Sequence, residues 1–169
     1  MSTSELHRIV IVGGGAGGLE LATQLGDRLG RRGRAEVTLI DAARTHVWKP
    51  LLYEVAAGSL DSHADRLEYL AQARWHHFRF RLGRMDGLDR ANRRVHVAAT
   101  LDADGSEIVP RRSFPYDTLV IAIGSQANDF GVPGVQQHCL MLDTPEEARE
   151  FHRRLINACL RAHTQEAPV

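Results

Sequence analysis

Three glycines near the start of the chain have a spacing that can bind phosphate. Gly13, Gly15 and Gly18 form the pattern G-x-G-x-x-G. In this pattern the first glycine makes a tight turn, the second lets the backbone approach a pyrophosphate, and the third allows a helix to pack closely on a strand. A helix that begins here offers unpaired N–H groups and a positive dipole end to the phosphates. The pattern therefore predicts a dinucleotide-binding loop.

The flanking segments supply the elements that this loop needs. Four branched apolar residues, Ile9 to Val12, precede the glycines and predict a buried strand. A helix is expected from about Ala16 to Arg31, ended by Gly30 and Gly33. A second strand, Val37 to Ile40, is followed by Asp41, which lies 23 residues beyond Gly18. An acid at this distance is suited to accept a hydrogen bond from a ribose hydroxyl.

The middle of the chain is expected to contain short elements. The Lys49-Pro50 step predicts the start of a short helix, and residues 65–75 predict another helix with Leu67, Leu70 and Ala71 on one face. Alternation of apolar and polar residues between about 78 and 109 predicts a small antiparallel meander. Its first strand would contain Phe78, Phe80 and Leu82, and turns are expected at 89–92 and at Asp104-Gly105.

The last third of the chain is expected to return to parallel, buried structure. The run Leu119 to Ile123 predicts a strand that is covered on both faces and ends at Gly124. Residues 128–134 predict a loop. Thr144, Pro145 and Glu147 predict a capping box that opens a helix, whose apolar stripe contains Phe151, Leu155, Ile156 and Cys159.

Composition excludes several classes of function. Lys+Arg and Asp+Glu both number 21, so the net charge of zero gives no indication of nucleic-acid binding. No signal peptide and no membrane-spanning run is expected, which favours a cytoplasmic protein. The spacing of the nine histidines predicts no metal site. Cys139 and Cys159 lie twenty residues apart in no redox motif, and the apolar neighbours of Cys159 predict a reduced, buried thiol.

Four segments together resemble the type II NADH dehydrogenases, which are flavoenzymes that pass electrons from NADH to a quinone. These are residues 8–25, 46–61 (HVWKPLLYEVAAGSLD), 114–130 and the helix that follows Asp143. The second segment is the most specific, because the others are common to a wider flavoprotein superfamily. The resemblance implies an α/β, Rossmann-like FAD/NAD(P)-binding fold of three layers, with a parallel sheet and a small antiparallel meander inserted.

The resemblance also implies a set of residues that bind FAD. The glycine loop would hold the pyrophosphate, Asp41 would contact the adenosine ribose, and Lys49 to Leu52 would line the flavin. Met85 would meet the adenine through backbone atoms, and Ala122 to Gly124 would lie beside the phosphates. The full set expected to bind the cofactor is Gly13, Gly14, Gly15, Ala16, Gly17, Gly18, Asp41, Ala42, Lys49, Met85, Ala122 and Gly124.

The chain departs from this family in length. Family members are more than twice as long and contain a second glycine fingerprint for NADH, which is absent from this sequence. We therefore expect an N-terminal fragment with an FAD-binding domain at 1–135 and a linker helix at 143–163 that leads to an absent NADH-binding domain. Catalytic residues are expected in the missing part, so that NADH and quinone would be used only by the completed enzyme. Complete members lie on the cytoplasmic face of the inner membrane as peripheral proteins.

Two alternatives remain open at this point. The chain could be a non-catalytic remnant or assembly module that associates with another chain, or with itself, through the helix at 144–160. An ordinary NAD-binding dehydrogenase domain is disfavoured by the segment Lys49 to Leu52 and by the meander.

Overall fold

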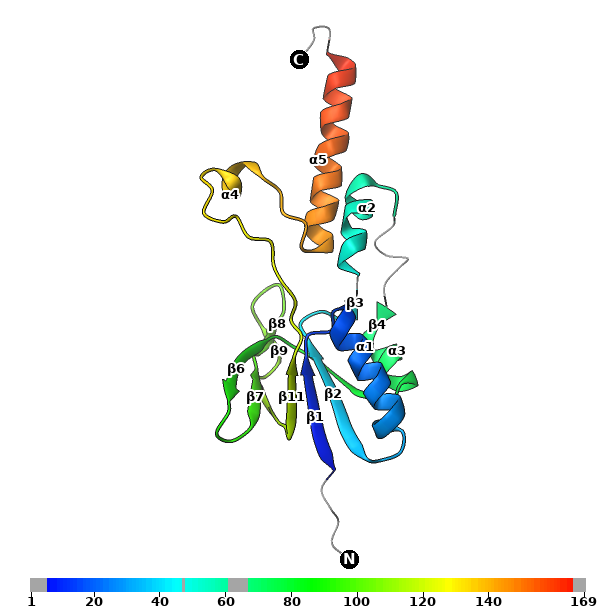
Figure 1. Cartoon of the computed structure of the whole chain (residues 1–169). Helices are drawn as coiled ribbons and strands as arrows, with labels where there is room; N and C mark the ends of the chain where they lie inside the picture. Colours follow the sequence, from blue (N-terminus) through cyan, green and yellow to red (C-terminus); the bar gives the residue numbers. More distant parts are fainter. Residues whose placement is uncertain (1–5, 47, 61–66, 166–169) are drawn as a thin grey trace, which may run out of the picture. The chain divides into compact units, whose positions relative to one another are not determined.

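The computed structural model describes residues 6–46, 48–60 and 67–165 (Figure 1). The chain forms two compact units, each of which is assembled from two segments. The first unit combines Met1–His46 with Leu67–Gly124, and the second combines Val47–Arg66 with Ser125–Val169.

A four-stranded parallel sheet forms the centre of the first unit. Its strands are β1 (His7–Val12), β2 (Ala35–Asp41), β5 (Arg79–Leu82) and β11 (Thr118–Ile121), in the order β11-β1-β2-β5. All three neighbouring pairs are parallel. The strands predicted at 9–12 and 37–40 are therefore confirmed, and so is the parallel sheet. The strand predicted at 119–123 is also present, but it ends at Ile121.

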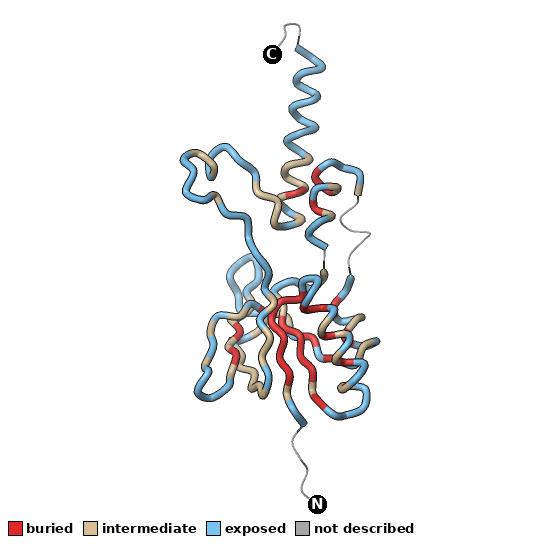
Figure 2. Tube along the Cα trace, in the orientation of Figure 1, coloured by how far each residue is buried: buried red, intermediate tan, exposed pale blue. Residues whose placement is uncertain are grey.

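Alternating side chains of the central strands enter two separate cores. Ile9, Ile11, Val37 and Leu39 pack against the helices α1 (Ala16–Leu25) and α3 (Tyr69–Trp75). Val10, Val12 and Ile40 pack instead with Val95 and Val97 of a second sheet. Helices, parallel sheet and antiparallel sheet thus form the three layers of the predicted Rossmann-like fold, with the most deeply buried strands in the middle layer (Figure 2). The first helix continues beyond Leu25 as a π-helical segment, Gly26–Gly30.

The antiparallel layer consists of β6 (Met85–Asp89), β7 (Arg94–Val97) and β10 (Arg112–Pro115), in the order β10-β7-β6. The short strands β8 (Thr100–Leu101) and β9 (Glu107–Val109) form a hairpin, and β3 (Thr45–His46) pairs with β4 (Leu67–Glu68). The predicted turns at 89–92 and 104–105 are both present. The assignment of Phe78 to Leu82 to the meander was wrong, because β5 pairs in parallel with β2.

Three other expectations are corrected by the burial of side chains. In α3 the buried face consists of Tyr69 and Ala73, whereas Leu70 is exposed. The helix was predicted to begin at residue 65, but Leu67 is exposed and lies in strand β4, and residues 65 and 66 lie outside the described residues. Strand β11 is at the sheet edge, so Leu119 and Val120 are only half-buried and Ile121 and Ile123 are exposed. Cys159 is exposed rather than buried.

The second unit is built around a contact between two helices. A 3-10 turn (Lys49–Leu51) leads into α2 (Leu52–Ala57), and a short helix α4 (Val135–His138) precedes α5 (Pro145–Thr164). Leu52, Val55 and Ala56 of α2 pack against Ala148 of α5, with Phe151 at the margin. Among the described residues, no helix combines the length and the apolar content needed to cross a membrane.

Candidate functional site: the glycine loop and its supports

The predicted site of the first unit lies where its parallel strands end. The glycine loop connects β1 to α1, Asp41 is the last residue of β2, and Ala122 to Gly124 directly follow β11. Because the strands are parallel, their carboxyl ends meet at one edge of the sheet. The order of the strands reverses at β1, which has β2 on one side and β11 on the other. Ligands of open α/β sheets bind at such a reversal point.

Gly13 and Gly18 have the geometry that the fingerprint requires. Gly13 has a φ of +101°, and a Cβ on it would lie 2.4 Å from the carbonyl oxygen of Ala122. A Cβ on Gly18 would lie 1.8 Å from the carbonyl oxygen of Gly13. The first glycine therefore makes the turn and the third permits close packing of helix on strand, as predicted. The same contacts bring Ala122 next to the loop.

Gly15, Ala16 and Gly17 form the solvent-exposed side of the loop, whereas Gly13, Gly14 and Gly18 are buried. No atom lies within 4 Å of the position that a Cβ on Gly15 or on Gly17 would occupy. Gly15 is also the N-cap of α1, and no side chain caps this helix end. The first N–H groups of a helix lack partners within the helix. The exposed side of the loop can therefore accept the phosphates of a dinucleotide.

Asp41 is tied to the loop through its carboxylate. Its Oδ2 accepts a hydrogen bond from the N–H of Gly14 at 2.6 Å, and its Oδ1 accepts one from the N–H of Ala43 at 2.7 Å. Ala42, which lies between Asp41 and Ala43 in the sequence, is exposed. The carboxylate is thus beside the glycine loop, as a ribose-binding acid requires, and its oxygens are engaged by backbone donors.

Tyr69 is a residue of this site that the sequence did not indicate. Its hydroxyl donates a hydrogen bond to the carbonyl oxygen of Gly14 at 2.7 Å, and the side chain is 2% exposed. Its ring stacks on Phe80 with a centroid separation of 5.0 Å. Fifty-five residues separate Tyr69 from Gly14. No local pattern could have revealed this contact.

Burial near Asp41 shifts the pKa of Tyr69 and of His46. The pKa of Tyr69 is raised above its ordinary value, first by burial and then by the negative charge of Asp41. The pKa of His46 is lowered by burial, although the Asp41 carboxylate and a hydrogen bond with the backbone of Gly14 oppose this effect. Tyr69 is therefore a neutral hydrogen-bond donor at physiological pH.

Met85 opens β6 and packs at the margin of the core between the two sheets. Two residues before it, Gly83 donates its N–H to the carbonyl oxygen of Asp41 at 2.8 Å. The backbone that leads to Met85 thus leaves the sheet at the end of β2. Gly124 has a φ of +73° and is exposed.

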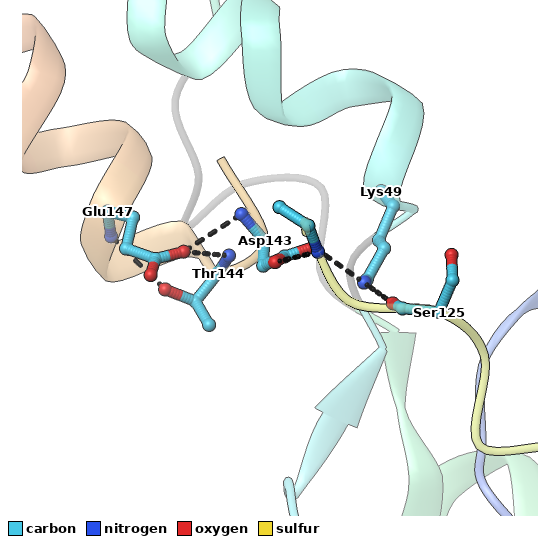
Figure 3. Close-up of polar contacts among 6 residues, drawn as sticks. Lys49, Ser125, Asp143, Thr144 and Glu147 are labelled. Atoms are coloured by element: carbon cyan, nitrogen blue, oxygen red, sulfur yellow. Dashed lines mark hydrogen bonds and ion pairs between the residues drawn. The ribbon is translucent and has the colours of Figure 1, made fainter. Parts of the chain in front are cut away.

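Lys49 belongs to the second unit, where it joins two segments (Figure 3). Its Nζ donates to the carbonyl oxygen of Ser125 at 2.6 Å and lies 3.1 Å from Oδ1 of Asp143. The other oxygen of Asp143 accepts from the N–H of Ala127 at 2.6 Å. The hydrogen bond from Ala127, followed by the contact with Lys49, lowers the pKa of Asp143. Lys49 and Asp143 together fix both ends of the segment 125–143.

Asp143 and Lys49 lie at the starts of the two helical regions of this unit. Asp143 immediately precedes the predicted capping box of α5, in which Thr144 and Glu147 exchange hydrogen bonds as expected. Leu52 points into the core between α2 and α5 and is 2% exposed, so its side chain is not free to line a ligand. Lys49 and Pro50 are exposed, and Leu51 is half-buried.

Residues 7–163 match the sequence model of a family described as pyridine nucleotide-disulphide oxidoreductase. The chain is 45% identical over 156 residues to a type II NADH:quinone oxidoreductase of Haemophilus influenzae, with 92% of this chain and 35% of the relative covered. It is 30% identical to the type II NADH:quinone oxidoreductase NdhA of Mycobacterium tuberculosis, over 90% of this chain and 30% of the relative. The chain thus spans about a third of the length of these relatives.

Solved structures support the fold. NDH2 of Plasmodium falciparum in complex with RYL-552 is similar with a TM-score of 0.75 and 17% identity, over 96% of this chain and 31% of that chain. The sulfide:quinone oxidoreductase of Aquifex aeolicus is similar with a TM-score of 0.70 and 22% identity, over 91% of this chain and 32% of that chain. At these identities the likeness shows the fold alone.

Proposed function

The chain belongs to the pyridine nucleotide-disulphide oxidoreductase family, and from this premise we propose that its first unit binds FAD at the glycine loop. The observation that carries the proposal is the open, exposed backbone at Gly15, which begins α1 beside the Asp41 carboxylate. A pyrophosphate at this position would accept hydrogen bonds from backbone N–H groups at the positive end of the helix dipole. A side chain at position 15 would occupy the same space.

The other expected contacts follow from the same placement. Asp41 would accept hydrogen bonds from the ribose hydroxyls at the acceptor sites that its two backbone bonds leave free. Ala42 adjoins it in the sequence. Ala122 and Gly124 would lie beside the phosphates, because Ala122 already contacts the loop. Met85 would meet the adenine through its backbone. Lys49 would line the flavin through the exposed part of its segment.

We propose further that the chain represents the FAD-binding part of an NADH:quinone oxidoreductase. Bound FAD supplies hydride and electron transfer, while the protein binds and orients the reactants. Cys139 and Cys159 are both exposed and twenty residues apart, which argues against the disulfide chemistry of other family members. The domain at 1–135, the linker helix at 143–163 and a location on the cytoplasmic face of a membrane are parts of this proposal.

The 169-residue polypeptide alone is expected to lack turnover. Hydride transfer requires the nicotinamide and the flavin to be held in one geometry. The sequence contains one G-x-G-x-x-G fingerprint, which is assigned to FAD. NADH oxidation with a short-chain quinone should therefore not exceed the rate of free FAD. A saturable rate that copurifies with the chain would refute this expectation.

Titration of FAD into the purified chain tests the binding proposal directly. Fluorescence quenching and heat of binding are expected for the unmodified chain and for a control variant, Ser106→Ala, in the turn between β8 and β9. Gly15→Val should lose binding while keeping its circular dichroism spectrum, since nothing in the protein occupies that space. Absence of any signal with monodisperse, folded protein would overturn the proposal.

A second proposal concerns self-association through α5. Leu155, Ile156 and Leu160 of the predicted stripe are 41%, 44% and 58% exposed, whereas Phe151 is half-buried against α2. Exposed apolar side chains that adjoin on one helix face favour association. The face at 155–160, rather than Phe151, would therefore be the surface where two copies meet.

A further inference from the structure

Gly14 has both of its backbone polar groups bound by side chains from distant parts of the first unit. Its N–H donates to Asp41 at 2.6 Å, and its carbonyl oxygen accepts from the hydroxyl of Tyr69 at 2.7 Å. Position 14 is a variable residue of the fingerprint. Here, however, a Cβ would lie 2.4 Å from the Tyr69 hydroxyl oxygen, so the glycine is needed for the close approach of Tyr69.

These two hydrogen bonds orient two successive peptide planes. A trans peptide is planar, and its C=O and N–H point in opposite directions. The bond from Tyr69 to the carbonyl of Gly14 therefore also fixes the direction of the N–H of Gly15, which belongs to the same peptide. The bond to Asp41 fixes the preceding peptide, whose carbonyl is that of Gly13. The N–H of Gly15 consequently points away from Tyr69.

We propose that Tyr69 is a positioning residue of the dinucleotide site, which holds the N–H of Gly15 in the direction that a bound phosphate requires. This inference rests on the proposed function. Tyr69 acts through Gly14 rather than by contact with the ligand. Its burial at 2% exposure and its stacking on Phe80 hold the ring in one place, so that the hydroxyl restrains the loop before any ligand arrives.

Energetic considerations favour this role. An oriented donor costs no reordering when the ligand binds, which raises affinity without a new contact. The net contribution of one hydrogen bond to stability is about 0.5–1.5 kcal/mol, which corresponds to roughly two- to tenfold in an equilibrium constant. Loss of the Tyr69 hydroxyl leaves the carbonyl of Gly14 with His46 as its side-chain partner. The restraint on the peptide that carries the N–H of Gly15 is therefore weakened.

The test compares Tyr69→Phe with Tyr116→Phe. Tyr116 packs at the margin of the core on the opposite face of the parallel sheet and serves as the control. Dissociation constants for FAD and for ADP are measured at a temperature where every variant is fully folded, so that a loss of stability alone does not alter them. Tyr69→Phe is expected to raise the dissociation constants of both ligands by roughly two- to tenfold. Tyr116→Phe should leave both unchanged.

Replacement of Tyr69 by 4-aminophenylalanine retains an N–H donor at the same place and is expected to restore most of the affinity. Equal affinity of Tyr69→Phe and the unmodified chain would overturn the inference while leaving the proposed function intact. Absence of binding by the unmodified chain would instead refute the proposed function.

A measurement on the unmodified chain decides the matter if Tyr69→Phe does not fold. Without ligand, the backbone order parameter of Gly15 is expected near the rigid value of about 0.85. A value below about 0.6, typical of flexible backbone, would overturn the inference. The exposed hairpin residue Gly105 provides the internal comparison for a loop glycine.

Discussion

Arg8 and Asp117 are joined by four hydrogen bonds where the neighbouring strands β1 and β11 begin. The N–H of Arg8 donates to Oδ2 of Asp117 at 2.8 Å, and its guanidinium donates to both carboxylate oxygens at 3.1 Å. Asp117 directly precedes β11, and its own N–H donates to the carbonyl oxygen of Arg8 at 2.9 Å. The pair therefore sets the register in which the last strand enters the parallel sheet.

This pairing predicts a dependence of stability on pH. The hydrogen bonds from Arg8 lower the pKa of Asp117 from its ordinary value to about 2. Because the folded pKa is the lower one, the stabilisation is complete above about pH 4 and is lost as the pH falls through about 2. The difference in free energy of unfolding between the unmodified chain and Asp117→Asn should therefore shrink between these values. Denaturant titrations across pH 2–6 measure it, and a constant difference would contradict the prediction.

Neighbouring glycines at the start of α1 should respond in opposite ways to alanine. Gly18→Ala places a Cβ against the carbonyl of Gly13, and overpacking of this kind costs about 1–3 kcal/mol or more. Gly17→Ala meets no atom within 4 Å, and removal of a helical glycine contributes up to about 1 kcal/mol of stability. Thermal and denaturant unfolding compare the two. Equal effects of both substitutions would show that the helix does not pack on the loop as described.

The interior of the second unit makes a similar contrast between adjacent residues. Leu52→Ala removes a side chain that is 2% exposed in the core between α2 and α5, which is expected to cost about 2–5 kcal/mol. Tyr53→Ala alters a side chain that is 61% exposed and should change stability by about 0.5 kcal/mol or less. Amide exchange in α5 provides the readout for this unit. A larger effect of Tyr53→Ala would place the core on the other face of α2.

Sedimentation tests the association proposed for α5. The unmodified chain is expected to form dimers or larger species at micromolar concentrations. Leu155→Glu combined with Leu160→Glu should shift it to monomer, because both side chains are exposed and can be changed without disturbing the core. Arg161→Glu, a change of charge on the same helix, is the control. If the unmodified chain sediments as a monomer at these concentrations, the proposal is refuted.

Much of the fold could be predicted because the decisive signals are local. The branched run at 9–12, the glycine spacing and the capping box at Thr144 each specify an element within a few residues, and all three are present. Alternation along Phe78, Phe80 and Leu82 gave the correct buried face of β5 but not its partner. A half-buried strand has the same period whether its neighbour is parallel or antiparallel.

The missed features depend on contacts between distant residues. In α3 Tyr69 is buried and Leu70 is exposed, which is the opposite of the predicted apolar face. Tyr69 is buried because it donates a hydrogen bond to Gly14 and stacks on Phe80, and both of these residues lie outside the helix. Exposure of Ile121 and Ile123 follows from the edge position of β11, which the apolar run itself does not encode. Placement of the cofactor residues stays a prediction.

The presence of both buried and exposed glycines in the loop has a consequence for mutational scanning. Substitutions at Gly13, Gly14 and Gly18 collide with the protein's own atoms, so a screen for the amount of folded protein in cells would detect them. Substitutions at Gly15 meet empty space and would be recorded as neutral by the same screen. A second screen that retains cells by flavin content would detect them. The loop's structural and ligand-facing positions could thus be separated in living cells without purifying any variant.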